Sequence, residues 1–414
     1  MMDTGKDRSS IISKLRHVGD MYYILVVLAY TSTLMFFGMR PGVVATALML
    51  FILAVLAAGH DLKVKTLQDV LAVVFFVYEI LSVIWLLAGG FPLSVFTGEF
   101  ISSVLPMVFY FVGKSAGRAT GRWYRIYIAA MLILGILGIA LYALAPQFYN
   151  DWLVALKYTS KADAATTRVR MNSVVGSTIL SFNMVAGMMV SAWFMNTKRT
   201  DRSKHDMAFA VTGMTVCFLS AVLANQRSGL VAAALVIVYV NCLVFFVLDM
   251  IPRKYFWIEL GTVAVLFIAL CAVRFDYVLK FWYRIISLPT AVSERSEQWV
   301  AAVNNMYTTW LGNGLGANGH RAIGIEDAHV IADGGLVKLY CENGVIGFSI
   351  WIYLILLAVR NGAKRLSDHY TELGIVAVGI LQSIGSNMLA FQFCAPVFWF
   401  AVGRMCTDHD GEAE

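Results

Sequence analysis

Charge is what this sequence has least of, because only 14% of its 414 residues are Asp, Glu, Lys or Arg. Ordinary soluble domains have about 25% charged residues, whereas 59% of this chain is hydrophobic and its mean hydropathy is +0.72. This scarcity of charge excludes a soluble enzyme. Apolar segments of about 20 residues cross the hydrocarbon core as helices, so we expect an all-α polytopic membrane protein, with residues 1–414 forming a single integral membrane domain.

Long basic runs and paired cysteines are also missing. The net charge is +6, but no Lys/Arg run has the length of a nucleic-acid-binding tail, so we predict no nucleic-acid partner. The six cysteines lie mostly in apolar stretches without a C-x-x-C pair, which argues against a disulfide framework and a structural zinc site.

The first apolar stretch, 21–37, is too long for a signal peptide and lacks a small-x-small cleavage site before Arg40, so we expect it to stay as the first span.

Apolar windows predict about twelve transmembrane helices, at 18–38, 42–58, 67–89, 95–113, 123–145, 173–195, 207–225, 229–248, 255–273, 345–359, 372–388 and 391–405. Two connections are long, 146–172 and 274–344. Of the 32 Lys and Arg residues, 20 fall on the side that holds the N-terminus, and the short turns of the other side carry only Arg40 and Arg227. The positive-inside rule therefore predicts cytoplasmic termini and two long loops on the outer face.

Few acidic residues interrupt these spans: Glu79, Glu99 and Glu259. We expect each to be interfacial or paired with a neighbouring helix. A transporter of charged cargo usually carries more ionisable residues at mid-membrane. Because no repeat of inverted halves is visible either, the pattern weakens a transporter interpretation.

The densest polar chemistry lies in the second long loop and the residues after it, from Arg274 to Gly347. Its G-x-G-x-G stretch at 312–316 neither follows a predicted strand nor sits in a βαβ unit, so a dinucleotide site fails and a turn with close backbone approach is expected. Asp333 is placed to N-cap a helix that runs to Asn343, with Gly344 as its C′ glycine.

Three motifs in this order resemble those of the O-antigen polymerase (Wzy-type) and O-antigen ligase superfamily: NQRSG at 225–229, WLGNGLG at 310–316 and DGGLVKLYCENGVIG at 333–347, together with Arg295 and Trp299. The resemblance is specific over 225–350 and topological elsewhere. Ligase-type members usually carry a His-Asn pair where this chain has Asp333 and Gly334, so the resemblance favours a polymerase.

The resemblance implies a glycosyltransferase of lipopolysaccharide biosynthesis in the bacterial inner membrane. Such an enzyme moves a growing glycan from undecaprenyl diphosphate onto the next lipid-linked repeat unit at the periplasmic face. The implied partners are the undecaprenyl-diphosphate-linked oligosaccharide, membrane lipid, a chain-length-regulating co-polymerase and a flippase. Two alternatives stay open: a ligase that transfers the glycan to lipid A core, and a transporter that flips lipid-linked oligosaccharides.

A lipid diphosphate leaving group needs fixed cations, and arginine forks bind phosphate oxygens bidentately. Arg227 is the first candidate because it lies in a tight outer turn between apolar spans; an arginine that snorkels to the interface is the alternative. Arg295 is the second, although Glu294 and Glu297 offer it surface salt bridges. Further candidate contacts to diphosphate or glycan are Arg168, Arg170, Arg284, Arg321 and Glu342. Arg168 and Arg170, with Lys157 and Lys161, form either a basic rim or a solvated loop.

The attacking sugar hydroxyl needs a general base. His329 is the first candidate because an imidazole titrates near neutrality, with Asp333 as its orienter or substitute. Glu326 and Asp327 are alternatives, as is a His329 that is only a solvated loop residue. His320, Asp327, His329 and Asp333 have the atoms of a metal site without a diagnostic spacing, so we predict neither a metal nor a cofactor.

Overall fold

The computed structural model describes residues 15–156, 170–196, 204–249 and 288–406, apart from 18 and 37–39, together with scattered positions in 252–286. Every element in this part of the chain is helical. Eight of its helices are long and apolar enough to cross a membrane. The expected all-α polytopic membrane architecture is therefore confirmed at this level.

The α-helices are α2 (Tyr22–Ser32), α3 (Pro41–Ala58), α4 (Leu67–Leu81), α5 (Val83–Ala88), α6 (Leu93–Glu99), α7 (Val108–Ala116), α8 (Thr120–Leu144), α9 (Gln147–Ala155), α11 (Ser177–Asn196), α12 (Lys204–Ala224), α13 (Arg227–Cys242), α15 (Leu288–Asn304), α16 (Gly335–Lys364), α17 (Leu366–Gly385) and α18 (Ala395–Arg404). Short π- or 3₁₀-helical turns join or extend them: η1 (Phe100–Val104), η2 (Leu105–Met107), η3 (Gly117–Ala119), η4 (Leu243–Val247), η5 (His320–Ala322) and η6 (Met388–Ala390).

Eight predicted spans coincide with the eight crossing helices, which are Pro41–Ala58, Leu67–Ala88, Leu93–Ala116, Thr120–Leu144, Ser177–Met195, His205–Ala224, Arg227–Val247 and Gly335–Lys364. The full number of twelve is not confirmed. Within the described chain α2 has 11 residues and α18 has 10, and at 1.5 Å per residue neither alone crosses a core of about 30 Å. Helix α17 has 20 residues but is not among the eight. The span predicted at 255–273 lies largely outside the described residues.

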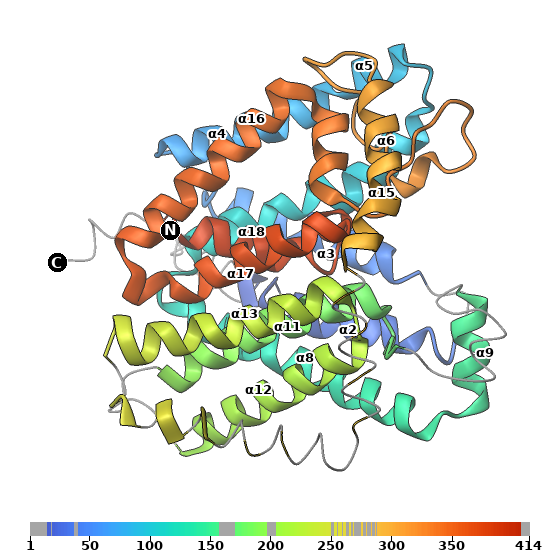
Figure 1. The fold of residues 1–414 in the computed structure, drawn as a ribbon. Coiled ribbons are helices and arrows are strands. Elements are labelled where there is room, and N and C mark those ends of the chain that lie inside the picture. Colours follow the sequence, from blue (N-terminus) through green and yellow to red (C-terminus); the bar gives the residue numbers. More distant parts are fainter. Residues whose placement is uncertain are drawn as a thin grey trace, which may run out of the picture.

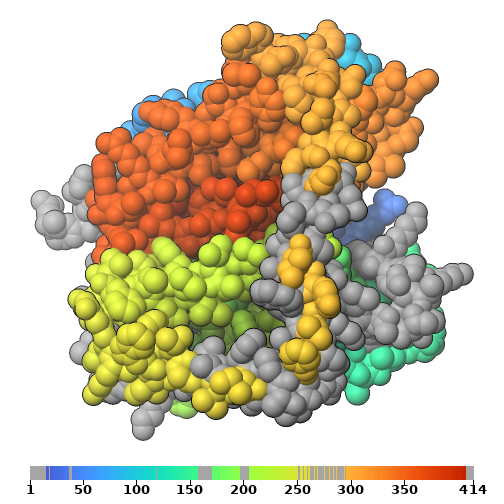
Figure 2. Space-filling view, in the orientation of Figure 1, coloured from blue at the N-terminus to red at the C-terminus, as the bar shows by residue number. Residues whose placement is uncertain are grey.

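The long helices run side by side, with α15 at the upper right and α9 at the lower right of Figure 1. Helices α8, α11, α12 and α13 pack into one group, while α4 packs on α16. Helix α17 contacts α11 and α13 on one side and α16 and α18 on the other. Figure 2 shows the red α17–α18 surface between orange α16 and yellow-green α13. Helix α17 thus joins the two groups.

Two glycines bring α18 unusually close to α7. A Cβ on Gly113 would overlap the carbonyl oxygen of Phe400, and a Cβ on Gly403 would overlap the carbonyl oxygen of Tyr110. Small residues at a helix interface allow such backbone contact, which replaces the hydrophobic driving force that lipid does not supply. The short helix α18 is therefore held by tight packing against α7.

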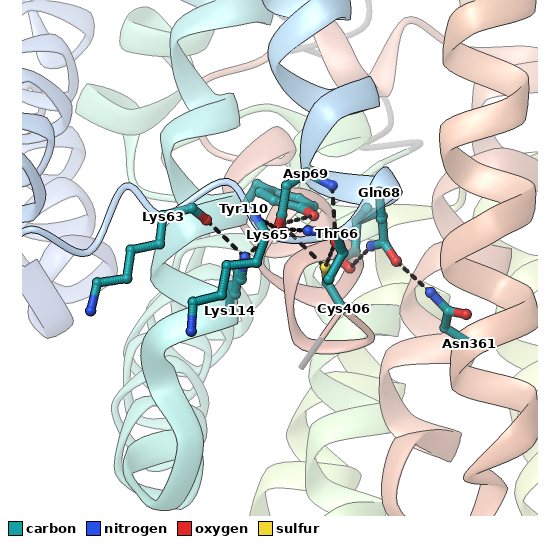
Figure 3. Close-up of polar contacts among 10 residues, drawn as sticks. Lys63, Lys65, Thr66, Gln68, Asp69, Tyr110, Lys114, Asn361 and Cys406 are labelled. Atoms are coloured by element: carbon teal, nitrogen blue, oxygen red, sulfur yellow. Dashed lines mark hydrogen bonds and ion pairs between the residues drawn. The ribbon is translucent and has the colours of Figure 1, made fainter. Parts of the chain in front are cut away.

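A polar network ties the start of α4 to α7 and to the end of α18 (Figure 3). Thr66 and Asp69 form a reciprocal capping box at the start of α4. The carboxylate of Asp69 also accepts from the hydroxyl of Tyr110 at 2.8 Å and forms an ion pair with Lys114. The thiol of Cys406, at the end of α18, lies 3.1 Å from the Thr66 hydroxyl. These contacts fix the three helix ends relative to one another.

Helix α16 is broken at Gly344, where φ is 59° and ψ is −169°. The loop at 309–314 forms backbone hydrogen bonds with the residues on both sides of this break. The amides of Asn313 and Gly314 donate to the carbonyls of Cys341 and Glu342 at 2.8 and 2.9 Å. In return, the amides of 345 and 346 donate to the carbonyls of 309 and 310 at 2.9 and 3.1 Å. The predicted helix break at Gly344 is confirmed, and so is the close backbone approach of the glycine stretch.

Candidate functional site

Arg227 is the first residue of α13, and only Asn225 and Gln226 separate it from α12. Asn225 has a φ of 51°, a left-handed turn conformation that asparagine adopts more readily than most residues. The side-chain amide of Gln226 donates to the hydroxyls of Ser177 and Thr178 at 2.7 and 3.0 Å. The predicted tight turn is therefore present, and it positions Arg227 where the N-termini of α13 and α11 meet.

Arg295 on α15 makes the central ion pair of this region. Its Nη2 lies 2.7 Å from Oδ2 of Asp333, and its Nη1 donates to the carbonyl oxygen of Gly385 at 3.4 Å. Gly385 ends α17 and also faces Ser228 of α13. The Arg295 side chain is 33% exposed. Solutes can therefore reach the Arg295 guanidinium, which is held by Asp333 and by the end of α17.

Neighbouring residues hold both the backbone and the carboxylate of Asp333. The indole Nε1 of Trp299 donates to the Asp333 carbonyl at 2.7 Å, and Nδ2 of Asn387 donates to the carbonyl of Ile331 at 2.9 Å. Gly334 has a φ of 127°, and a Cβ there would overlap the Trp299 indole. The segment before α16 is consequently fixed against α15 and the α17–α18 connection.

The prediction that Asp333 caps the following helix is wrong by one residue. Gly334 occupies the N-cap position of α16 without a side-chain cap, and the Asp333 carboxylate is turned to Arg295 instead. An ion pair with a guanidinium satisfies the carboxylate more strongly than a neutral backbone amide does. Asp333 therefore belongs to the charged site and not to the helix terminus.

Arg170, from the connection between α9 and α11, completes the group. Partial removal from water lowers the pKa of its guanidinium; the positive charges of Arg227 and Arg295 lower it further, and Asp333 opposes the shift. Arg170 therefore lies within electrostatic range of Arg227, Arg295 and Asp333. We call Arg170, Arg227 and Arg295 the arginine cluster. A group of arginines in which Arg295 pairs with Asp333 is a setting that favours binding of an anion.

The other predicted site residues lie apart from this cluster or outside the described chain. His329 is half-buried, and its backbone carbonyl accepts from Asn318 at 2.8 Å. No hydrogen bond or ion pair joins its imidazole to the arginine cluster within the part of the chain that the structure describes. Arg321 is exposed and lies against Gly98 of α6. Arg168, Arg284, Lys157 and Lys161 lie outside the described residues, whereas Glu326 and Asp327 are exposed.

Glu342 is fully buried and belongs to an ionic network that sequence reasoning did not single out. Nζ of Lys338 lies 2.8 Å from Oε1 of Glu99 and 2.8 Å from Oε2 of Glu342, and all three side chains are at most 7% exposed. Ser103 donates to Glu99 at 2.6 Å. The expectation that Glu99 is paired with a neighbouring helix is confirmed. The burial of Glu342 favours a role in the fold, while its predicted substrate contact stays a prediction.

A small cavity of about 50 Å³ lies beside this network. Glu79, Lys338, Ser383 and Asn387 are among its lining residues. One oxygen each of Glu79, Ser383 and Asn387 has no hydrogen-bond partner within the described chain. This volume has room for a few waters, which buried polar groups commonly bind. Asn387 also holds the segment before Asp333, so the cavity lies directly behind the candidate site.

Among the residues that the structure describes, no three His, Cys, Asp or Glu side chains approach closely enough to share a metal ion. Comparison of the chain with protein-family models and with curated proteins gave no significant match. The candidate site is therefore defined by its geometry: an accessible arginine cluster and one carboxylate, supplied by α13, α15 and the segments before α11 and α16.

Proposed function

We propose that this protein is an O-antigen polymerase, a glycosyltransferase that joins lipid-diphosphate-linked oligosaccharide repeat units. The observation that carries the proposal is the ion pair of Arg295 with Asp333, with Arg170 within electrostatic range of Asp333, Arg295 and Arg227, from segments far apart in the sequence. A diphosphate needs several fixed cations at once, and guanidinium groups bind its oxygens bidentately. The motifs at 225–229 and 333–347 supply Arg227 and Asp333, while the motif at 310–316 pairs with the backbone at the break in α16.

The proposed reaction uses the ion pair between Arg295 and Asp333 as its starting point. A bound diphosphate competes with Asp333 for Arg295, which frees the carboxylate. An acceptor sugar hydroxyl then attacks the anomeric carbon of the donor, the bond from that carbon to the diphosphate oxygen breaks, and the arginine cluster stabilises the charge on the departing lipid diphosphate. The hydroxyl proton passes to Asp333 or to His329, and from there to solvent.

Asp333 is the better placed of these two bases. A general base must lie within hydrogen-bond reach of the hydroxyl that it deprotonates. Asp333 already forms an ion pair with Arg295 of the arginine cluster, where the diphosphate is proposed to bind. His329 precedes it by four residues on a connection held by Asn318. The imidazole therefore needs the substrate, or a shift of this connection, to bring it to the reacting atoms.

The proposed orientation has the arginine cluster at the periplasmic face of the inner membrane. The opposite helix ends carry Lys114, Arg125, Arg360 and Lys364, as expected for the cytoplasmic side of short connections. Lipid-linked repeat units would then reach the cluster from the outer leaflet.

The test is a transfer assay on purified protein in lipid nanodiscs with undecaprenyl-diphosphate-linked repeat units. A ladder of lengthened glycans supports the polymerase, and product formed only after addition of core lipid indicates the ligase. Absence of both, with lipid-linked substrate crossing the bilayer of proteoliposomes, indicates transport.

Arg227→Ala and Arg295→Ala should each remove the ladder, because each deletes a cation that balances the leaving diphosphate. Loss of a charge-stabilising donor of this kind costs about 10²–10³-fold in rate. Arg125→Ala is the matched control, since Arg125 pairs with Asp206 at the other end of the bundle and its side chain is 59% exposed. Wild-type ladders from either cluster variant would contradict the assignment.

A further inference from the structure

A second basic site lies at the opposite end of the bundle, as a pocket of about 380 Å³. It forms where the start of α4, the end of α16, the start of α17 and the end of α18 meet. Helix α17 begins beside this pocket at Leu366 and ends at Gly385 beside Arg295, and its 20 residues span about 30 Å. The pocket is therefore separate from the arginine cluster.

Hydrogen bonds between helices hold the walls of this pocket in place (Figure 3). Gln68 donates from Nε2 to the carbonyl of Val402 at 2.9 Å, and its Oε1 accepts from Nδ2 of Asn361 at 2.9 Å. Gln68 is completely buried, so this bridge between α4, α16 and α18 is protected from water. The pocket is consequently formed before any ligand arrives, which lowers the entropic cost of binding.

The charged side chains that line the pocket are all of one sign. Arg360 and Lys364 are one helical turn apart on α16 and share a face, and Arg365 follows at the end of the helix. His369 adds an imidazole, whereas no Asp or Glu is among the lining residues. Within the described chain no ion pair is formed by Arg360 or Lys364, whereas Nδ1 of His369 lies 3.8 Å from the carboxylate of Glu372. The negative end of the α16 dipole is enough to explain basic residues in the last turn of this helix. It does not explain why a preformed pocket surrounds them.

We infer that this pocket binds a phosphate group, with the headgroup of an anionic phospholipid as the ligand that its walls fit best. Cations concentrated in a preformed cavity attract an anion with several acceptor oxygens, and basic pockets between membrane helices take up such headgroups. The pocket also has apolar residues at its edge. Leu67 and Leu357 line it, and Leu67 is 53% exposed, which provides a surface for acyl chains beside the phosphate. This inference does not depend on the proposed glycosyltransferase activity.

The test compares phospholipid retention by the purified full chain in native mass spectrometry, with phosphatidylglycerol or phosphatidylcholine added to the detergent. Wild type should retain phosphatidylglycerol in preference to phosphatidylcholine. The double variant Arg360→Gln/Lys364→Gln should bind phosphatidylglycerol about 30-fold more weakly, because each basic residue at a membrane surface contributes about 1 kcal/mol. Lys63→Gln/Lys65→Gln is the matched control, since both lysines are exposed near Thr66 and neither lines the pocket.

Inorganic phosphate distinguishes the two possible sources of the ligand. If millimolar phosphate displaces the retained phosphatidylglycerol from wild type, free phosphate is also a ligand of this pocket; if it does not, the lipid headgroup is. Equal phosphatidylglycerol binding by wild type and by the Arg360→Gln/Lys364→Gln variant would overturn the inference. An equal loss in the Lys63→Gln/Lys65→Gln control would do so as well, because it would show general surface attraction. Thermal unfolding of each variant without added lipid separates loss of binding from loss of folding.

Discussion

Replacing Lys338 with methionine is expected to destabilise the protein by removing the cation that bridges two buried carboxylates. Nζ of Lys338 lies 2.8 Å from Glu99 and 2.8 Å from Glu342, and the two carboxylate side chains are 5% and 1% exposed. Removing one partner of a buried ion pair costs about 3–5 kcal/mol, because a charge stays behind without compensation. With an unfolding entropy that scales with 414 residues, this corresponds to a fall in Tm of about 3–6 °C.

The assay is tryptophan-fluorescence thermal unfolding in detergent, with Lys63→Met as the control because Lys63 is exposed. The triple variant Lys338→Met/Glu99→Gln/Glu342→Gln should regain most of the lost stability, because it removes the two stranded charges together with the lysine. A Tm for Lys338→Met within about 1 °C of wild type would refute the reasoning, as would a triple variant less stable than the single one. Either outcome would mean that the carboxylates are not ionised partners of Lys338.

Gly334→Ala should reduce glycan transfer more than it reduces Tm, because a side chain at a φ of 127° is strained and would push Trp299 away from Asp333; equal transfer by this variant and wild type would contradict the assigned position of Asp333. Gly403→Ala should lower the Tm by separating α18 from α7 at Tyr110, whereas Gly261→Ala, whose added methyl group meets no packed neighbour within 4 Å among the described residues, should leave the Tm unchanged. Treatment with EDTA should leave the rate of transfer unchanged if arginines alone balance the leaving diphosphate; a rate that falls with EDTA and returns with a divalent cation would argue for a metal-assisted reaction.

The parts of the fold that the sequence predicts well are the long apolar helices and the short turns between them. Eight spans have enough consecutive apolar residues to be visible without any tertiary information. The turn at Arg227 follows from the same pattern, because the residues around it must leave one apolar helix and enter the next. Short helices such as α18 carry less of this signal, since tight packing at Gly403 holds α18 against α7.

The contacts of the candidate site are less visible in sequence. Arg295 and Asp333 lie on separate elements, and nothing in their spacing shows that Arg170, in the connection before α11, lies within electrostatic range of both. The pair of Lys338 and Glu342 has a usable signal, because opposite charges at i and i+4 in an otherwise apolar segment indicate an intrahelical ion pair. Glu99 has no such signal, since 239 residues separate it from Lys338.

The break in α16 has a consequence for how both halves of this helix depend on the loop before it. Lipid cannot satisfy the backbone groups that an interrupted membrane helix leaves open, and here the connection at 309–314 satisfies them. That connection precedes α16 in the chain by about twenty residues, so the groups that satisfy the break are local in sequence. The interrupted helix and the loop at 309–314 therefore form one structural unit, and a substitution that displaces the loop is expected to disturb both halves of α16.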